Sequence, residues 1–186
     1  MKRLFLVIAI GMVAAVSTSA QESVFGKNDN VVNLGVSFGG NLYSGYSGIS
    51  RIPTISLSFE RCIIDNLFND KSAIGVGGLV SYTTAKYDYA GYDYGWRSTD
   101  ILLGGRGAFH YAFVNKLDTY AGFMLGYNIS SWKWHGLGYT ETDSGSGGLY
   151  YSFFAGARYY FTPSIAAFAE AGYGYSLLTA GLTFKF

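Results

Sequence analysis

The sequence is poor in charged residues. Asp, Glu, Lys and Arg make up only 13% of its 186 residues, whereas a typical soluble domain carries about 25%. The formal net charge is +1. Nothing in this charge balance favours nucleic acid or another polyanion as a partner.

The sequence also has almost no cysteine and no second long apolar run. Cys62 is the single cysteine, so it cannot form an intramolecular disulfide. We interpret it as a small apolar residue near a strand end, with a reactive or intermolecular thiol as the alternative. After residue 16, no apolar run approaches the roughly 20 residues of a membrane-spanning helix. No metal-site spacing, phosphate-binding glycine loop or redox pair is present, so we expect no metal and no cofactor.

The N-terminus has the layout of a secretory signal peptide. Lys2 and Arg3 precede an apolar run over residues 4–16, and a stretch of small residues ends at Ala20. This pattern predicts cleavage after Ala20. The apolar run is too short to favour the alternative, a membrane anchor. We therefore expect a signal peptide over residues 1–20 and one barrel domain over residues 21–186.

Glycine and aromatic residues are abundant, with 26 Gly, 17 Tyr and 14 Phe. Large apolar residues alternate with small or polar ones along about eight segments, which is the period of a β-strand. In one segment Val32 and Leu34 alternate with Asn33 and Gly35. Each segment is close to the 9–11 residues that a tilted strand needs to cross a bilayer. The pattern predicts an all-β fold, an antiparallel up-and-down transmembrane β-barrel of about eight strands.

The connections between these segments alternate in length, as in outer-membrane barrels. Tight turns are expected at 115–116 and 162–164. Longer loops rich in Gly, Ser, Tyr and Asp are expected near 40–50, 86–97 and 132–147. Two connections fit this alternation less well, namely a long, partly apolar first turn at about 62–71 and a very short last loop around 174–175.

The two faces of the strands suit different surroundings. The smaller face is mostly Gly, Ser, Thr and Ala, with too few charges to coat a soluble lipocalin or β-sandwich. It suits the narrow interior of an eight-stranded barrel. The large apolar face then meets lipid, and closure of the barrel leaves no unpaired strand edge in the bilayer. Tyr and Phe near the strand ends match the aromatic girdles of such barrels.

The C-terminal segments 168–174 and 181–186 resemble the closing hairpin of the small OmpX/OmpA-like outer-membrane β-barrel family. The resemblance implies a location in the bacterial outer membrane. It also implies that a terminal aromatic residue, preceded by apolar residues at alternate positions, is read by the barrel-insertion machinery. In this chain those positions are Leu182, Phe184 and Phe186. Because this fold supports adhesins, structural anchors, narrow pores and lipid-modifying enzymes, it leaves the activity open.

A set of charged residues falls on the face assigned to the lumen. Unpaired buried charges are costly, so we expect these side chains to form a network that plugs the barrel. Arg158 and Glu170, on neighbouring strands, are the pair that we expect first. A gated path for protons or ions is the alternative. The expected lumenal network is Glu60, Asp100, Arg106, His110, Arg158, Glu170 and Lys185.

The second and third long loops are rich in Tyr and Trp. Rigid aromatic surface with interspersed carboxylates suits recognition of an extracellular glycan or protein, although girdle aromatics in a protruding hairpin would have the same composition. The expected contact residues are Tyr87, Tyr89, Tyr92, Tyr94, Trp96, Trp132 and Trp134.

Three functions remain open on the sequence. We favour a structural, adhesin-like barrel that is not an enzyme, with the lipid bilayer and lipopolysaccharide as its surroundings. A narrow pore for ions or small solutes is the first alternative. A lipid-modifying enzyme is the second, because His135 lies near Glu141, Asp143 and Ser144; such a set can activate a hydroxyl, but no spacing enforces it.

Overall fold

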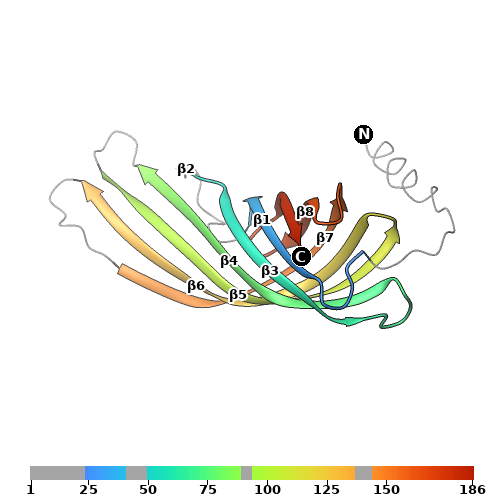
Figure 1. Ribbon diagram of the computed structural model, residues 1–186. Helices are drawn as coiled ribbons and strands as arrows, with labels where there is room; N and C mark the ends of the chain where they lie inside the picture. The colour runs from blue at the N-terminus through green and yellow to red at the C-terminus, as the bar shows by residue number, and fades with distance from the viewer. Residues whose placement is uncertain (1–23, 41–49, 89–93, 137–143) are drawn as a thin grey trace, which may run out of the picture.

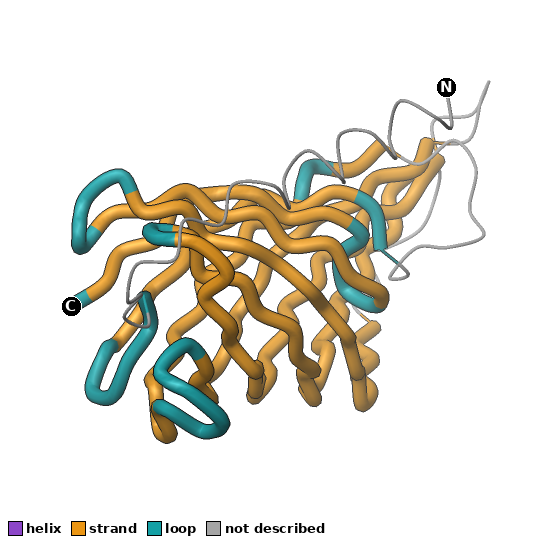
Figure 2. The backbone as a smooth tube through the Cα atoms, turned by 90° about the vertical axis from the view of Figure 1, so that its right-hand side faces the viewer, coloured by secondary structure: helices purple, strands orange, loops and turns teal. Residues whose placement is uncertain are grey.

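A computed structural model of the chain describes residues 24–40, 50–88, 94–136 and 144–186. The expected signal peptide, residues 1–20, lies outside these ranges. In the described part the regular structure consists of strands joined by loops (Figure 2). Within the described ranges there is no helix with the length and apolar character needed to cross a membrane.

Eight strands close into a ring, which confirms the predicted fold class. Each strand pairs antiparallel with the next, and β1 completes the ring by pairing with both β3 and β9. A ninth, two-residue strand, β2, lies beside β4. The strands are β1 (Asn30–Phe38), β2 (Ser50–Arg51), β3 (Thr54–Asp65), β4 (Ser72–Asp88), β5 (Tyr94–Val114), β6 (Leu117–Gly136), β7 (Ser144–Tyr160), β8 (Ile165–Tyr173) and β9 (Leu178–Lys185).

Strands β2 and β3 follow each other along the same side of β4. Pro53 separates them, and proline has no N–H to donate to a neighbouring strand. Pairing continues on both sides of it, because the Ile52 N–H donates to the Thr84 carbonyl at 3.1 Å and Thr54 begins the regular part of β3. Strands β2 and β3 therefore act as one strand interrupted at a proline.

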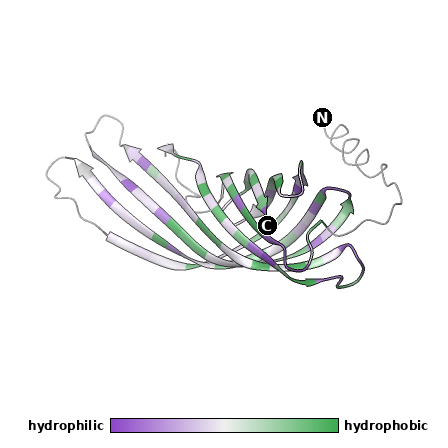
Figure 3. Ribbon diagram, in the orientation of Figure 1, coloured by the Kyte–Doolittle hydropathy of each residue, from purple (hydrophilic) through white to green (hydrophobic). Residues whose placement is uncertain are grey.

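Apolar and polar positions alternate along the strands as the sequence predicts (Figure 3). Leu34 is 52% exposed on the outer face, whereas its neighbour Asn33 is 2% exposed inside. The register places Leu34 beside Leu57 on one side and Leu182 on the other. Exposed apolar side chains thus continue from strand to strand, and a belt of this extent suits lipid rather than water.

One end of the barrel carries three of its short turns, and a fourth, at residues 174–177, lies at the opposite end. The first three are residues 66–71, 115–116 and 161–164, and Val24 and Phe186 lie at the same end as these three. Bacterial outer-membrane barrels place their short turns in the periplasm, so we assign this end to the periplasmic side. The first turn is shorter than predicted, because β3 keeps its pairing as far as Asp65.

At the opposite end, four strands run on past their neighbours (Figure 1). Strands β4 to β7 have 17, 21, 20 and 17 residues, whereas β1, β8 and β9 have 9, 9 and 8. We call this extension the outer wall; it comprises residues 85–88, 94–98, 131–136 and 144–149. The predicted loops at 86–97 and 132–147 were therefore wrong in part. The described residues of these two segments have loop-like composition, but they continue the strand pairing.

Candidate functional site

A cluster of four ionisable side chains fills the periplasmic half of the barrel interior. Arg158, which is fully buried, donates from Nη1 to Asp118 Oδ2 at 3.0 Å and from Nη2 to Glu60 Oε2. His110 lies between the same two carboxylates. Its Nε2 is 2.7 Å from Glu60 Oε1, and its Nδ1 is 2.9 Å from Asp118 Oδ1. Four different strands thus contribute to one closed set of contacts.

A second ion pair lies beside this cluster. Arg106 Nη2 is 2.7 Å from Glu170 Oε1, and the Tyr120 hydroxyl donates to the same oxygen at 2.9 Å. The Arg106 guanidinium also lies over the Phe154 ring, 4.1 Å from its centroid. Tyr120 connects the two groups, since its ring is 4.4 Å from the Arg158 guanidinium. Charged groups buried in this way are stable only when they are paired.

The expected pair Arg158–Glu170 is wrong. Both side chains point inward, but the register sets Arg158 beside Phe168 and Glu170 beside Gly156. Glu170 instead reaches Arg106 on β5, and Arg158 pairs both with Asp118 on the adjacent strand β6 and with Glu60 on the distant strand β3. A narrow barrel allows this because a long side chain spans much of its width.

Two of the expected network residues lie apart from these pairs. Asp100 is buried toward the outer end, where it accepts hydrogen bonds from Ser98 at 3.1 Å, from Asn128 at 3.0 Å and from Ser130. Lys185 lies at the periplasmic mouth, with its side chain 21% exposed. It is therefore at the rim rather than in the central network.

Asp118 and Phe25 belong to this interior but were missed from the sequence. Asp118 lies on the inward face of β6, at the second residue of the strand, before the alternating pattern becomes clear. Phe25 precedes the first strand, so no periodicity marks it. Its side chain is 1% exposed, and its ring centroid is 4.3 Å from that of His110. The segment before β1 thus closes over the periplasmic end of the network.

The described residues among the aromatics expected as loop contacts lie instead on strands, on the inward-facing side of the outer wall. Trp96 is only 5% exposed. Its ring centroid is 4.8 Å from that of Trp132 and 6.1 Å from that of Tyr87. Tyr94 and Trp134 are half-buried and stack at 5.8 Å. Tyr89 and Tyr92 lie outside the described residues. Trp96 is thus a packing residue, which corrects its expected role.

The opposite face of the outer wall carries a row of basic residues that the sequence reading missed. Lys86 pairs in register with Arg97, and Arg97 pairs with Lys133. Arg97 and Lys133 are exposed and Lys86 is half-buried. The three residues are far apart in the sequence, so only the register of the strands reveals that they are lateral neighbours.

Comparison with known proteins gives likenesses of structure alone. No protein-family model matches the chain, and no curated protein matches its sequence. The N-terminal β-barrel domain of Pseudomonas aeruginosa OprF is similar at a TM-score of 0.52 and 15% identity, over 87% of this chain and 99% of that one. Ail of Yersinia pestis, in complex with the heparin analogue sucrose octasulfate, is similar at a TM-score of 0.50 and 8% identity, over 87% and 100%. The chain has the fold of the small bacterial outer-membrane barrels.

As an outer-membrane barrel, the chain meets lipid with its exposed apolar belt. The residues expected to form the insertion signal lie in this belt: Leu182 is 48% exposed, Phe184 44% and Phe186 71%. Their outward direction is compatible with recognition by another protein during assembly. Glu141, Asp143 and the side chain of His135 lie outside the described part of the barrel, so the expected hydroxyl-activating set stays a prediction. Among the described residues, no group of three or more His, Cys, Asp or Glu could hold a metal ion.

Proposed function

We propose that this outer-membrane barrel is a sealed, non-enzymatic protein that acts through contacts made by its outer wall. The observation that carries the proposal is the division of its side chains between two regions. Paired charges fill the interior, whereas aromatic and basic side chains gather on the two faces of a wall that extends beyond the barrel.

The packing of the interior supports a sealed lumen. Toward the outer side of the two ion-pair groups lies an apolar cluster that includes Leu79, Leu102, Met124 and Tyr175, all at most 6% exposed. Phe25 covers the periplasmic side. An ion that crossed the barrel would have to displace buried, paired groups at each level, which is costly.

The inward-facing aromatics of the outer wall suit a partner with flat, partly apolar surfaces. Half-buried Tyr and Trp side chains offer rigid contact area at a low cost in conformational entropy. The Ail structure holds a sulfated sugar, and we transfer from it only the class of ligand, an extracellular glycan. Tyr94 and Trp134 are the pair we expect to make that contact, because Trp96 is already covered.

The basic row suits a different partner. Lys86, Arg97 and Lys133 lie on the outward face, just beyond the apolar belt, which is where the phosphates of lipopolysaccharide would lie. Lysine and arginine bind phosphate through charge-assisted hydrogen bonds. We assign to this row contact with lipopolysaccharide, and to Leu182, Phe184 and Phe186 contact with the barrel-insertion machinery during assembly.

The contact role is tested with the double variant Tyr94→Ser/Trp134→Ser. We expect the barrel to fold and its binding to a glycan array and to immobilised matrix proteins to fall. The matched control is Lys133→Ser, which changes the opposite face of the same strand and should leave that binding unchanged. Equal binding by all three proteins, or no binding by the unmodified chain, would contradict a contact role for the aromatic face.

The non-enzymatic part of the proposal has its own test. Lipid A from cells that overexpress the chain should have the same mass spectrum as lipid A from control cells. New acylated or deacylated species that disappear in a His135→Ala variant would show the lipid-modifying activity instead.

A further inference from the structure

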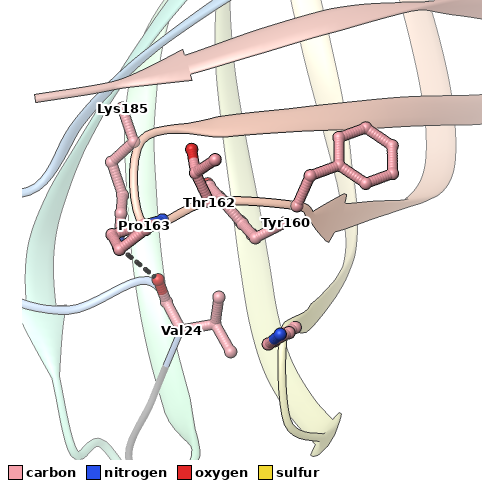
Figure 4. A pocket seen from close by; sticks show the side chains of 7 residues that line it. Val24, Tyr160, Thr162, Pro163 and Lys185 are labelled. Atoms are coloured by element: carbon pink, nitrogen blue, oxygen red, sulfur yellow. Dashed lines mark hydrogen bonds between the residues drawn. The ribbon is translucent and has the colours of Figure 1, made fainter.

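A pocket of about 260 Å³ opens at the periplasmic end, beside the turn between β7 and β8. Tyr160 and Thr162 form one side of it, and Val24 and Lys185 face them from the two ends of the described chain (Figure 4). Phe161 also lines the pocket. Lys116, from the turn between β5 and β6, completes the lining. Four segments that are separate in the sequence therefore meet at one concave site.

The polar groups of this pocket are mainly hydrogen-bond donors. Lys185 Nζ uses two of its three hydrogens on the Val24 carbonyl at 2.9 Å and on Asp29 Oδ2 at 3.2 Å. The Thr162 hydroxyl accepts from the Ile165 N–H at 3.0 Å and donates to no other described residue. Lys116 adds a second ammonium group, and no carboxylate is among the lining residues. Because Asp29 pairs with Lys185, the unbalanced positive charge at the site is that of Lys116, and hydrogen-bond donors outnumber acceptors among the lining side chains.

Tyr160 points to a ligand independently of the lysines. The residue is 3% exposed, and its hydroxyl finds no hydrogen-bond partner within the described chain. A buried hydroxyl without a partner costs free energy that a bound acceptor would restore. The Lys185 ammonium lies 5.2 Å from the centroid of the Tyr160 ring, and both residues line the same pocket.

We propose that this pocket binds a phosphate group. A phosphate offers several acceptor oxygens in different directions, which matches donors that converge from Lys116, Tyr160 and Lys185. The volume of the pocket exceeds that of a single phosphate group. Two sources present this chemistry at the periplasmic rim: the headgroup of a phospholipid in the inner leaflet, and free phosphate.

The surroundings of the pocket favour the phospholipid headgroup. Tyr159 and Phe161 flank the site on the outward face, 49% and 59% exposed. Aromatic residues at the end of a membrane strand lie at the level of the lipid headgroups. A lipid could therefore place its acyl chains along these rings while its phosphate enters the pocket.

The proposal is tested by NMR titration of the refolded mature chain in a neutral detergent. One arm uses inorganic phosphate and the other uses dihexanoylphosphatidylglycerol. We expect saturable shifts of the Lys116 and Thr162 amides. Lys116→Gln should weaken binding about tenfold or more, the effect of one lost charge-assisted contact. Lys27→Gln, which removes an exposed lysine at the same end without touching the pocket, should leave the affinity unchanged.

Tyr160→Phe separates a binding role from a packing role. Because the hydroxyl has no partner in the free protein, its removal should not lower the unfolding temperature without ligand, but it should weaken binding about threefold or more. Saturable binding in both arms would show that a phosphate group alone is sufficient for binding. Saturable binding of the lipid alone would show that the site needs the phospholipid headgroup. The absence of saturable shifts in both arms, or shifts that neither Lys116→Gln nor Tyr160→Phe alters, would overturn the proposal.

Discussion

Arg158 and Glu60 pair directly across the barrel, although three strands separate β7 from β3 in either direction round the ring. The pair therefore lies along a diameter and joins opposite walls. Asp118 makes a second contact with Arg158, and His110 makes a second contact with Glu60. A cross-section held in this way has little room for a channel, and this geometry underlies the proposed sealed lumen.

Removing one partner of the second ion pair should destabilise the barrel far more than removing both partners, because the remaining charge would be buried without a counter-charge. Glu170→Leu leaves the Arg106 guanidinium buried without its carboxylate and should lower the free energy of unfolding by about 3–5 kcal/mol. Arg106→Met/Glu170→Leu removes both charges and should recover most of that loss. Urea unfolding of the vesicle-inserted barrel, followed by tryptophan fluorescence, measures both. A double variant as unstable as the single one would contradict this explanation.

Gly156 provides the space that the network needs. A Cβ at this position would lie 2.7 Å from the Ala169 carbonyl oxygen, 2.8 Å from Glu170 Cγ and 2.9 Å from Tyr120 Cζ. Gly156→Ala should therefore destabilise the barrel by about 1–3 kcal/mol. At Gly105, on the lipid-facing side, the nearest atom would be 4.0 Å away, so Gly105→Ala should be nearly neutral. Equal unfolding free energies for the two variants would show that the interior is loosely packed.

Phe25 should contribute to stability although it lies outside the strands. Phe25→Ala opens a cavity next to His110 and should cost about 3–5 kcal/mol of unfolding free energy. Phe68, in the turn at the same end, is 79% exposed, and Phe68→Ala serves as the control with an expected loss below about 1 kcal/mol. A small loss for both variants would mean that the segment before β1 is not docked in the barrel.

The basic row should bind lipopolysaccharide in a salt-dependent way. Arg97→Glu/Lys133→Glu should weaken binding to lipopolysaccharide about tenfold at low salt, and the difference should shrink as salt screens the exposed charges. Lys27→Glu/Lys71→Glu makes the same change of net charge at the periplasmic end and should have little effect. Surface plasmon resonance at two ionic strengths distinguishes these results. Equal weakening by both double variants would indicate a general effect of net charge.

For most strand residues, the sequence predicts whether the side chain points into the barrel or outward, because alternation is a local property of the chain. The positions of Met124 inside and Leu125 outside follow from the period of two alone. The pairing of Arg158 with Glu60 could not be predicted, because it depends on the relative stagger of strands on opposite sides of the ring. That stagger is a property of the closed barrel and not of any single segment.

The outer wall and Phe25 escaped prediction for other physical reasons. Residues 94–97 and 132–136 have the composition of a loop, yet each finds a paired neighbour strand and stays extended. Phe25 lies in a segment without periodicity, so its docking depends on the cavity that the finished barrel presents. The basic row at Arg97 likewise exists only once the register is set.

The most direct test of the sealed barrel is the ion conductance of the refolded mature chain in a planar bilayer, with its insertion verified by protease protection. We expect a silent membrane, because buried ion pairs and the apolar layers on both sides of them occupy the lumen. Discrete conductance steps whose ion selectivity changes in Arg106→Met or Arg158→Met would contradict the account and would make the lumenal charges the functional site of a narrow pore.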